Sequence, residues 1–460
     1  MGVHQKWQMK MQRTPLLILS LLALLHGPAT AQSLSLKRYV QQHATSYEED
    51  AFLTGFTDPS LAEYQAVFFG FIHGSAAPQE ADYVLLEYLI GQGTRYYLPE
   101  VDYSMAFFLN RYLAQPEEEL LDLIAYHYAN KVPQDATVQW QEKWRQLAAL
   151  QARLPSHRKL IVLGTDAPAY DRRLALTHLA FLAPTAPTGN PWVDTLANFR
   201  DYTYEDLSIW SGKPVYEQAV ATGQTTYDFV YSLDSRYHFA KRFFAYASQH
   251  IEEISAAFGP QQAKARRILS VEPGMEREPY LFEEFERQAL PLLAAGEKVY
   301  ANFGYSHIHQ APVGGYDYLA GRIKQGHPEL KLASIVGLLA HSKALKERVF
   351  RKNGEEIHER GVVFEAAECT GYKPSSTWDG HTLWERPMGI ETITRRAGKR
   401  PYLWLNLTQE DSPFHEAPYL ARYSRGTKTW PIAGHTVATE YYQYLLLMQY
   451  SDSGIPYELD

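Results

Sequence analysis

The 460-residue chain contains a single cysteine, Cys369. One thiol cannot form an internal disulfide or a multi-thiolate zinc site, so any metal would have to be held by His, Asp and Glu. We interpret Cys369 as a small buried side chain rather than as a nucleophile. The chain also has no long basic run, and its formal net charge of −8 gives no indication of a nucleic-acid partner.

Long apolar runs are scarce as well. The strongest one, at 15–25, follows three basic residues and is too short to cross a bilayer comfortably. With the small residues at 29–31 it predicts a signal peptide over 1–31. We therefore expect an exported protein, periplasmic or secreted, with no integral membrane segment after the signal is removed.

What the chain does contain is an alternation of strand and helix patterns. The apolar run 65–72 predicts a buried strand, and Pro78 opens a predicted helix that ends at nearby glycines. A second strand at 94–102 and a second helix at 103–113 follow, and further strands are expected at 159–166, 298–307 and 330–339. This succession predicts an α/β fold with a mainly parallel sheet flanked by helices.

The same patterns divide the chain into three parts. After the signal peptide, we expect an α/β core over 32–345 that begins with a polar, helix-like stretch at 33–64. Helical insertions are expected at about 116–153 and 185–260. Residues 346–460 are assigned to the C-terminal part of the same domain, with candidate strands at 361–368 and 401–407.

Two predicted strands end alike, in Phe-Gly-aromatic-x-His, which places His73 and His307 after glycines. Two other strands end at Glu100 and Asp166, and ligands bind at the carboxyl edge of open α/β sheets. Two imidazoles and two carboxylates there would either activate water or hold a divalent metal, with His73 and His307 as ligands. The alternative is that each histidine is a hydrogen-bonded packing residue.

Three further residues are candidates for the same site. Arg277, at the start of a predicted helix, would clamp a carboxylate or stabilise an oxyanion. His309 would project on the same side as His307 if the strand continued, and would contact substrate or a metal. Glu80 lies near a helix N-terminus, where a carboxylate is favourable, and with Asp166 completes the candidate substrate contacts.

Four segments resemble one known family: "GFIHGS", "YYLPEVDYSMAFFLNRYL", "REPYLFEEF" and "KVYANFGYSHIHQ". Their order is similar to that of the erythromycin esterase-like group, whose superfamily also holds the Tiki/TraB proteases and the ChaN-like haem-binding proteins. The resemblance covers roughly 60–340. It implies that His73 is the water-activating or metal-binding histidine, Glu100 the strand-end carboxylate, Arg277 the arginine before the helix and His307 the second histidine. The chain has Phe71 where esterase and ChaN-like members usually have Glu.

Two functions are consistent with these residues. The first is an exported hydrolase that cleaves an ester, lactone or amide in a small molecule or peptide. In it His73 activates water, directly or through a divalent metal, Glu100 orients or shares the proton, and Arg277 stabilises the oxyanion with His307. The second is a non-catalytic exported protein in which the histidines bind haem, a metal or a small molecule. Phe71 favours the binding protein, whereas Glu100 and Arg277 favour the hydrolase.

Overall fold

The structure, a computed structural model, describes most of the chain from residue 35 to residue 455. The residues left out within that span are 130, 133, 169–171, 201–220, 222–234, 272–274, 353–354, 370–385, 418, 421, 424–428 and 431–436. The predicted signal peptide lies outside the described residues. In the described part, no helix is long and apolar enough to cross a membrane.

The centre of the molecule is an eight-stranded sheet with the order β1-β10-β13-β6-β2-β5-β3-β4. Its strands are β1 (Ala44–Tyr47), β2 (Ala66–Phe71), β3 (Tyr96–Pro99), β4 (Ile161–Val162), β5 (Val299–Gly304), β6 (Leu332–Ala340), β10 (Tyr402–Asn406) and β13 (Tyr444–Gln449). Every neighbouring pair from β13 to β4 is parallel, and only the pairs that β10 makes are antiparallel. The predicted α/β class with a mainly parallel sheet is confirmed.

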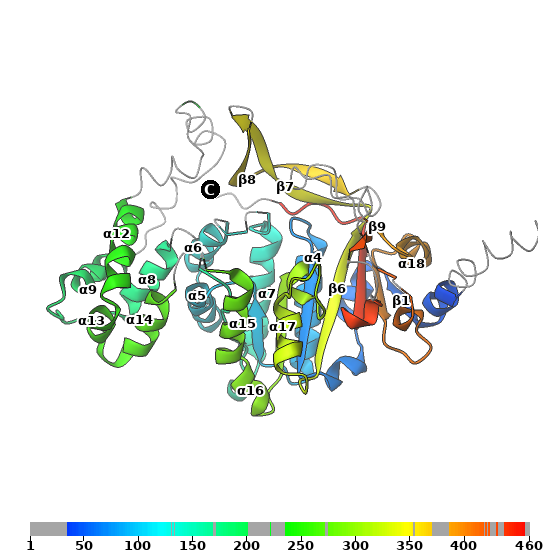
Figure 1. Cartoon of the computed structure of the whole chain (residues 1–460), viewed down its shortest axis with the longest axis horizontal. Coiled ribbons are helices and arrows are strands. Elements are labelled where there is room, and N and C mark those ends of the chain that lie inside the picture. The colour runs from blue at the N-terminus through cyan, green and yellow to red at the C-terminus, as the bar shows by residue number, and fades with distance from the viewer. Residues whose placement is uncertain are drawn as a thin grey trace, which may run out of the picture.

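Helices cover both faces of this sheet (Figure 1). One face packs against α3 (Glu49–Gly55), α4 (Ala77–Gly91), α5 (Tyr103–Ala114), α6 (Glu118–Ala129) and α7 (Val138–Arg153). The other packs against α15 (Arg277–Gln288), α16 (Leu290–Ala294), α17 (Leu319–Gly326) and α18 (Ile390–Ala397). Along β2, Val67 and Phe69 enter the first layer while Ala66 and Phe68 enter the second, because successive strand residues point to opposite faces. Burial on both sides explains why the strand sequences are continuously apolar.

A third apolar cluster lies at one end of the molecule, beside α5 (Figure 1). It is built by α8 (Arg173–Leu182), α9 (Pro191–Thr195), α12 (Ser235–Gln249), α13 (Ile251–Ala256) and α14 (Gln262–Leu269). These helices have their own core of buried aliphatic and aromatic side chains. They include the described part of the predicted insertion 185–260.

A two-stranded ribbon rises above the carboxyl edge of the sheet (Figure 1). It consists of β7 (Ser342–Lys352) and β8 (Glu355–Cys369), which include the predicted strand 361–368. A small separate sheet is formed by β9 (Arg386–Pro387), β11 (Arg422–Tyr423) and β12 (Thr429–Trp430). Thus β10 and β13 are the strands after residue 345 that join the main sheet within the described residues.

The stretch 33–64 is not helical throughout, as its polar pattern had indicated. A helix at 35–43 and α3 are separated by β1, which pairs antiparallel with β10. Long-range pairing with the sheet edge decides the conformation of these four residues, and strand preference depends strongly on such tertiary context. The prediction of helix is wrong for them.

Candidate active site

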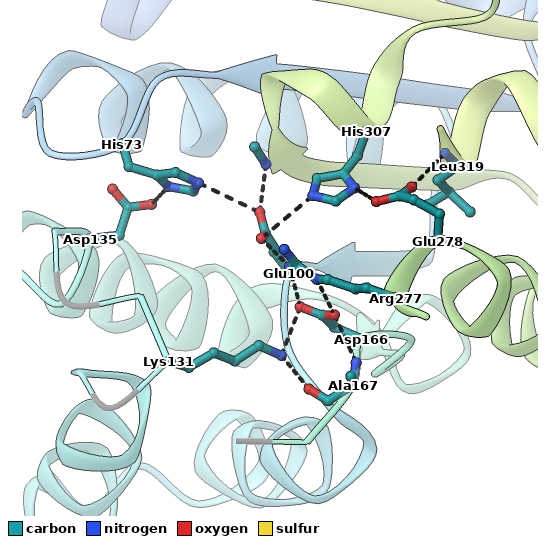
Figure 2. Close-up of polar contacts among 11 residues, drawn as sticks. His73, Glu100, Lys131, Asp135, Asp166, Ala167, Arg277, Glu278, His307 and Leu319 are labelled. Atoms are coloured by element: carbon teal, nitrogen blue, oxygen red, sulfur yellow. Dashed lines mark hydrogen bonds and ion pairs between the residues drawn. The ribbon is translucent and has the colours of Figure 1, made fainter. Parts of the chain in front are cut away.

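The four polar residues expected at the sheet edge come together in space (Figure 2). His73 follows β2, Glu100 follows β3, Asp166 follows β4, and His307 lies in the 3-10 turn Tyr305–Ile308 after β5. Since β2, β5, β3 and β4 are consecutive neighbours and parallel, their carboxyl ends lie at one edge. Arg277, the first residue of α15, reaches the same place from the helical layer.

Glu100 is the centre of this group. One carboxylate oxygen, Oε1, pairs with the Arg277 guanidinium, and the other, Oε2, accepts a hydrogen bond from Gly304 N at 2.5 Å. His73 Nε2 lies 3.8 Å from Oε2, and His307 Nε2 lies 3.9 Å from Oε1. Burial raises the pKa of Glu100, but Arg277 and then the two histidines outweigh burial and lower that pKa to about 2. Glu100 is therefore an ionised carboxylate that faces both imidazole rings.

His73 is held from behind by Asp135, in the loop between α6 and α7. The His73 Nδ1 to Asp135 Oδ2 distance is 2.6 Å, and the other oxygen of Asp135 accepts from Gly74 N at 3.0 Å. Burial lowers the pKa of His73, whereas Asp135 and, less strongly, Glu100 raise it, with a net result of about 9. Because Asp135 occupies Nδ1, the reactive nitrogen of His73 is Nε2, on the side of Glu100.

His307 also has a carboxylate beside its Nδ1, but at ion-pair distance and without hydrogen-bond geometry. Its Nδ1 lies 2.7 Å from Glu278 Oε1, and the second oxygen of Glu278 accepts from Leu319 N at 2.8 Å. Glu278 therefore ties the start of α15 to the start of α17 while it fixes the His307 ring (Figure 2). Two histidine–carboxylate pairs thus direct their Nε2 atoms at opposite oxygens of one shared carboxylate.

Asp166 lies beneath Arg277 and is fully buried. Arg277 Nε donates to Oδ1 at 2.9 Å, and its terminal nitrogen donates to Oδ2 at 2.7 Å. Lys131 Nζ also lies 2.7 Å from Oδ2 and donates to Ala167 O. Burial raises the pKa of Asp166, but the two cations hold it far below its usual range. Asp166 thus orients Arg277, whose own side chain is 41% exposed.

Glu80 and His309 lie apart from this group. Glu80 accepts a hydrogen bond from Tyr402 on β10, three strands from β2. His309 is buried and packs near the rings of Tyr305 and Tyr318 at centroid distances of 5.2 and 5.5 Å. The strand ends at Gly304 and the chain turns, so the register that would have put His309 beside His307 does not exist.

Sequence reasoning did not assign three residues that hold this site together: Lys131, Asp135 and Glu278. Glu278 directly follows Arg277 in the segment "REPYLFEEF". The other two fall inside the predicted helical block 116–153, where Pro133 and Asp135 already indicated a break between two helices. No pattern in the nearby sequence, however, shows that Asp135 contacts His73, more than sixty residues earlier in the chain.

The donor set does not fit a bound metal. Among the described residues there is no group of three or more His, Cys, Asp or Glu side chains placed to hold a metal ion. The carboxylate nearest both imidazoles, Glu100, already bears the Arg277 guanidinium.

No family model and no curated protein matches this sequence. Solved structures do match over nearly the whole chain. A mutant of erythromycin esterase EreC in its open conformation has a TM-score of 0.54 at 14% identity, covering 91% of this chain and 99% of its own. The chain has the fold of erythromycin esterase. A Bacillus cereus protein gives 0.54 at 11% identity over 93% and 99% of the two chains, and a succinoglycan biosynthesis protein gives 0.50 at 12% over 92% and 98%. The erythromycin esterase-like fold is thereby established, and a shared fold does not by itself specify a function.

Proposed function

We propose that this protein is an exported hydrolase that cleaves an ester, lactone or amide with water activated by His73. The observation that carries the proposal is the pair of histidine–carboxylate couples directed at one ionised carboxylate, Glu100, beside the exposed Arg277. Export is inferred from the signal-peptide pattern over 1–31. The erythromycin esterase-like fold supports a hydrolase without specifying the substrate.

Exposure indicates which groups meet the substrate. The His73 side chain is 23% exposed and that of Arg277 is 41% exposed, whereas Glu100 is only 6% exposed. A carbonyl group that enters from solvent therefore reaches the imidazole and the guanidinium first. Glu100 lies beneath both and sets their positions and charge.

In the proposed reaction, neutral His73 takes a proton from water at Nε2 while the water oxygen bonds to the carbonyl carbon. The negative charge that develops on the carbonyl oxygen is stabilised by Arg277 and by His307. Asp135 and Glu100 stabilise the imidazolium that forms. The bond to the leaving oxygen or nitrogen then breaks, and His73 returns its proton to that atom.

Asp135 bears directly on the choice between hydrolase and binding protein. Phe71 counted against catalysis because family members usually have a carboxylate at that position. The Phe71 ring packs edge-on against His73 at 5.2 Å, and Asp135 brings a carboxylate to Nδ1 from another part of the chain. The histidine therefore has the acidic partner that a general base requires.

The test is hydrolysis of a panel of esters, lactones and amides by the mature protein at pH 7 to 10. We expect His73→Ala to lower kcat/KM at least about 10²-fold, since an oriented base contributes about that much or more. His415→Ala, at an exposed histidine on the surface, is the matched control and should leave kcat/KM unchanged. Turnover that survives His73→Ala, or an inactive wild-type protein across the whole panel, would reject the proposal.

A further inference from the structure

A short loop between His307 and α17 ends in a tight, hydrogen-bonded turn. Val313 and Tyr316 exchange two backbone hydrogen bonds, each of 3.0 Å. Between them stand Gly314 and Gly315, with φ angles of 64° and 81°. This is a two-residue turn with positive φ at both central positions, which glycine adopts without strain. The turn presents Tyr316 to solvent, with 42% of the residue exposed.

From this tip, aromatic rings lead inward to the proposed active site. Tyr316 and Tyr318 pack edge to face at 5.2 Å, and Tyr318 packs against the His307 ring at 6.3 Å with an interplanar angle of 88°. The next residue, Leu319, donates its backbone N–H to Glu278, the partner of His307 (Figure 2). The loop is therefore fixed at both ends to the histidine that faces Glu100.

Polar groups border the exposed ring. The Arg322 guanidinium carbon lies over one face of the Tyr316 ring, 5.9 Å from its centroid, and Arg322 Nε donates to Asp317 O at 2.9 Å. Asp317 in turn accepts from Gln325 at 2.7 Å. A flat apolar surface bordered by hydrogen-bonding groups matches a ligand that has an apolar face and a polar rim.

We propose that Tyr316 and Tyr318 form a specificity subsite on the His307 side of the active site. It would bind the part of the substrate that carries a flat apolar face, which is either an aromatic ring or the C–H face of a sugar ring. The position of this subsite beside the reacting carbonyl rests on the proposed hydrolase function. Binding of the ring is independent of that function, because the tyrosines contact the ring without any chemical step.

Binding is measured first, in the His73→Ala background, so that turnover plays no part. The probes are 2-naphthol for the aromatic arm and methyl β-glucoside for the sugar arm, titrated by calorimetry or ligand-observed NMR. We expect one of them to bind. Tyr316→Ala should raise its Kd about 2- to 10-fold, which corresponds to the free energy of one aromatic ring contact, and Tyr316→Phe should retain the affinity. Tyr450→Ala, which removes another exposed tyrosine (52% exposed), should change nothing.

Turnover of ring-bearing and ring-free esters then tests the location. With 2-naphthyl acetate, Tyr316→Ala should raise KM about 2- to 10-fold and leave kcat nearly unchanged, whereas ethyl acetate should show no difference. Binding without turnover of any ester would reject the hydrolase and keep the subsite. The subsite is rejected if neither probe binds, or if Tyr316→Ala and Tyr450→Ala behave alike.

Discussion

Gly304 and His73 approach each other so closely that a Cβ on residue 304 would lie 2.9 Å from His73 Nε2. The same Cβ would lie 3.3 Å from Glu100 Oε2, the oxygen that accepts the Gly304 N–H. In the matching strand, a Cβ on Gly70 would lie 2.5 Å from the Ile308 side chain. The two similar strand endings therefore need glycine for one reason: each backbone packs against the opposite histidine-bearing segment.

Replacing Gly304 by alanine should damage the site more than the fold. The added methyl group must displace His73 or Glu100, and a misplacement on the order of 1 Å costs about 10²-fold in rate. We expect a loss of that size in kcat/KM, measured beside circular dichroism to verify folding. Gly91→Ala is the control, because a Cβ there meets no atom within 4 Å. Equal activity of the two variants would contradict the proposed geometry.

Activity should rise with pH. The proposed base is the neutral form of His73, and its pKa of about 9 means that this form accumulates as pH approaches 9. Because Asp135 is the leading cause of the raised pKa, Asp135→Asn should move the rising limb of kcat/KM to lower pH. It should also reduce the plateau about 10²- to 10⁴-fold, since an amide fails to hold the catalytic tautomer.

The pH–rate profile from pH 6 to 10 is the measurement, with NMR titration of the His73 ring as an independent record of its pKa. If the midpoint of the rise in kcat/KM with pH does not move in Asp135→Asn, Asp135 is not the partner of the base.

The pH dependence of folding stability is opposite to the pH dependence of activity. The raised pKa stabilises the folded state below pH 6.5, and this contribution is lost as pH rises through about 9.

Arg277 should matter for both charge and position. Arg277→Gln leaves Glu100 without its main counter-charge, so the pKa of Glu100 should rise, and Asp166 keeps only Lys131. We expect about a 10²-fold loss of kcat or more, as for other groups that stabilise an oxyanion. Arg145→Gln breaks an exposed pair with Glu118 and should cost at most about 1 kcal/mol of stability, with no loss of rate. Similar kinetics for the two variants would exclude Arg277 from the mechanism.

A second buried ion pair lies away from the site and should affect stability alone. Lys143 Nζ lies 2.7 Å from Asp82 Oδ2, and the Tyr97 and Tyr300 hydroxyls also donate to that carboxylate. Lys143→Met removes the cation from a buried carboxylate and should lower the free energy of unfolding by about 3–5 kcal/mol. Urea denaturation measures this, and Lys324→Met, at an exposed residue, is the control.

Adding Asp82→Asn to Lys143→Met should recover part of the lost stability, because the unpaired charge is then gone. The pH–rate profile should keep its midpoint in all of these variants. A double variant no more stable than Lys143→Met would mean that packing, rather than charge, dominates at this position.

The sequence predicted the parallel sheet well because burial on both faces leaves long apolar runs, which are visible locally. It also predicted that His73, Glu100, Asp166 and His307 would share an edge, because parallel strands place their carboxyl ends together. The partners of the histidines were not predictable in this way. Asp135 lies in a loop whose position depends on how α6 and α7 pack, and no local pattern encodes that packing.

Two strands of the main sheet, β1 and β13, were missed for a related reason. β1 is short and polar, and only its pairing with β10 makes it a strand. β13 is fully buried and apolar, and periodicity alone does not separate such a run from a buried helix. Its place between β6 and β10 follows from long-range pairing that the sequence near residue 444 does not reveal.

The position of β13 has a consequence for synthesis on the ribosome. β6 is complete at residue 340, but its neighbour β13 begins only at residue 444. At typical translation rates of about 5–20 residues per second, the edge of β6 stays unpaired for on the order of 5–20 s. Throughout that time β6, which is apolar and fully buried in the folded protein, has an open row of backbone hydrogen-bonding groups. Such an unpaired edge is a template for aggregation. The nascent chain is thus an expected client for chaperones until residue 449 has emerged.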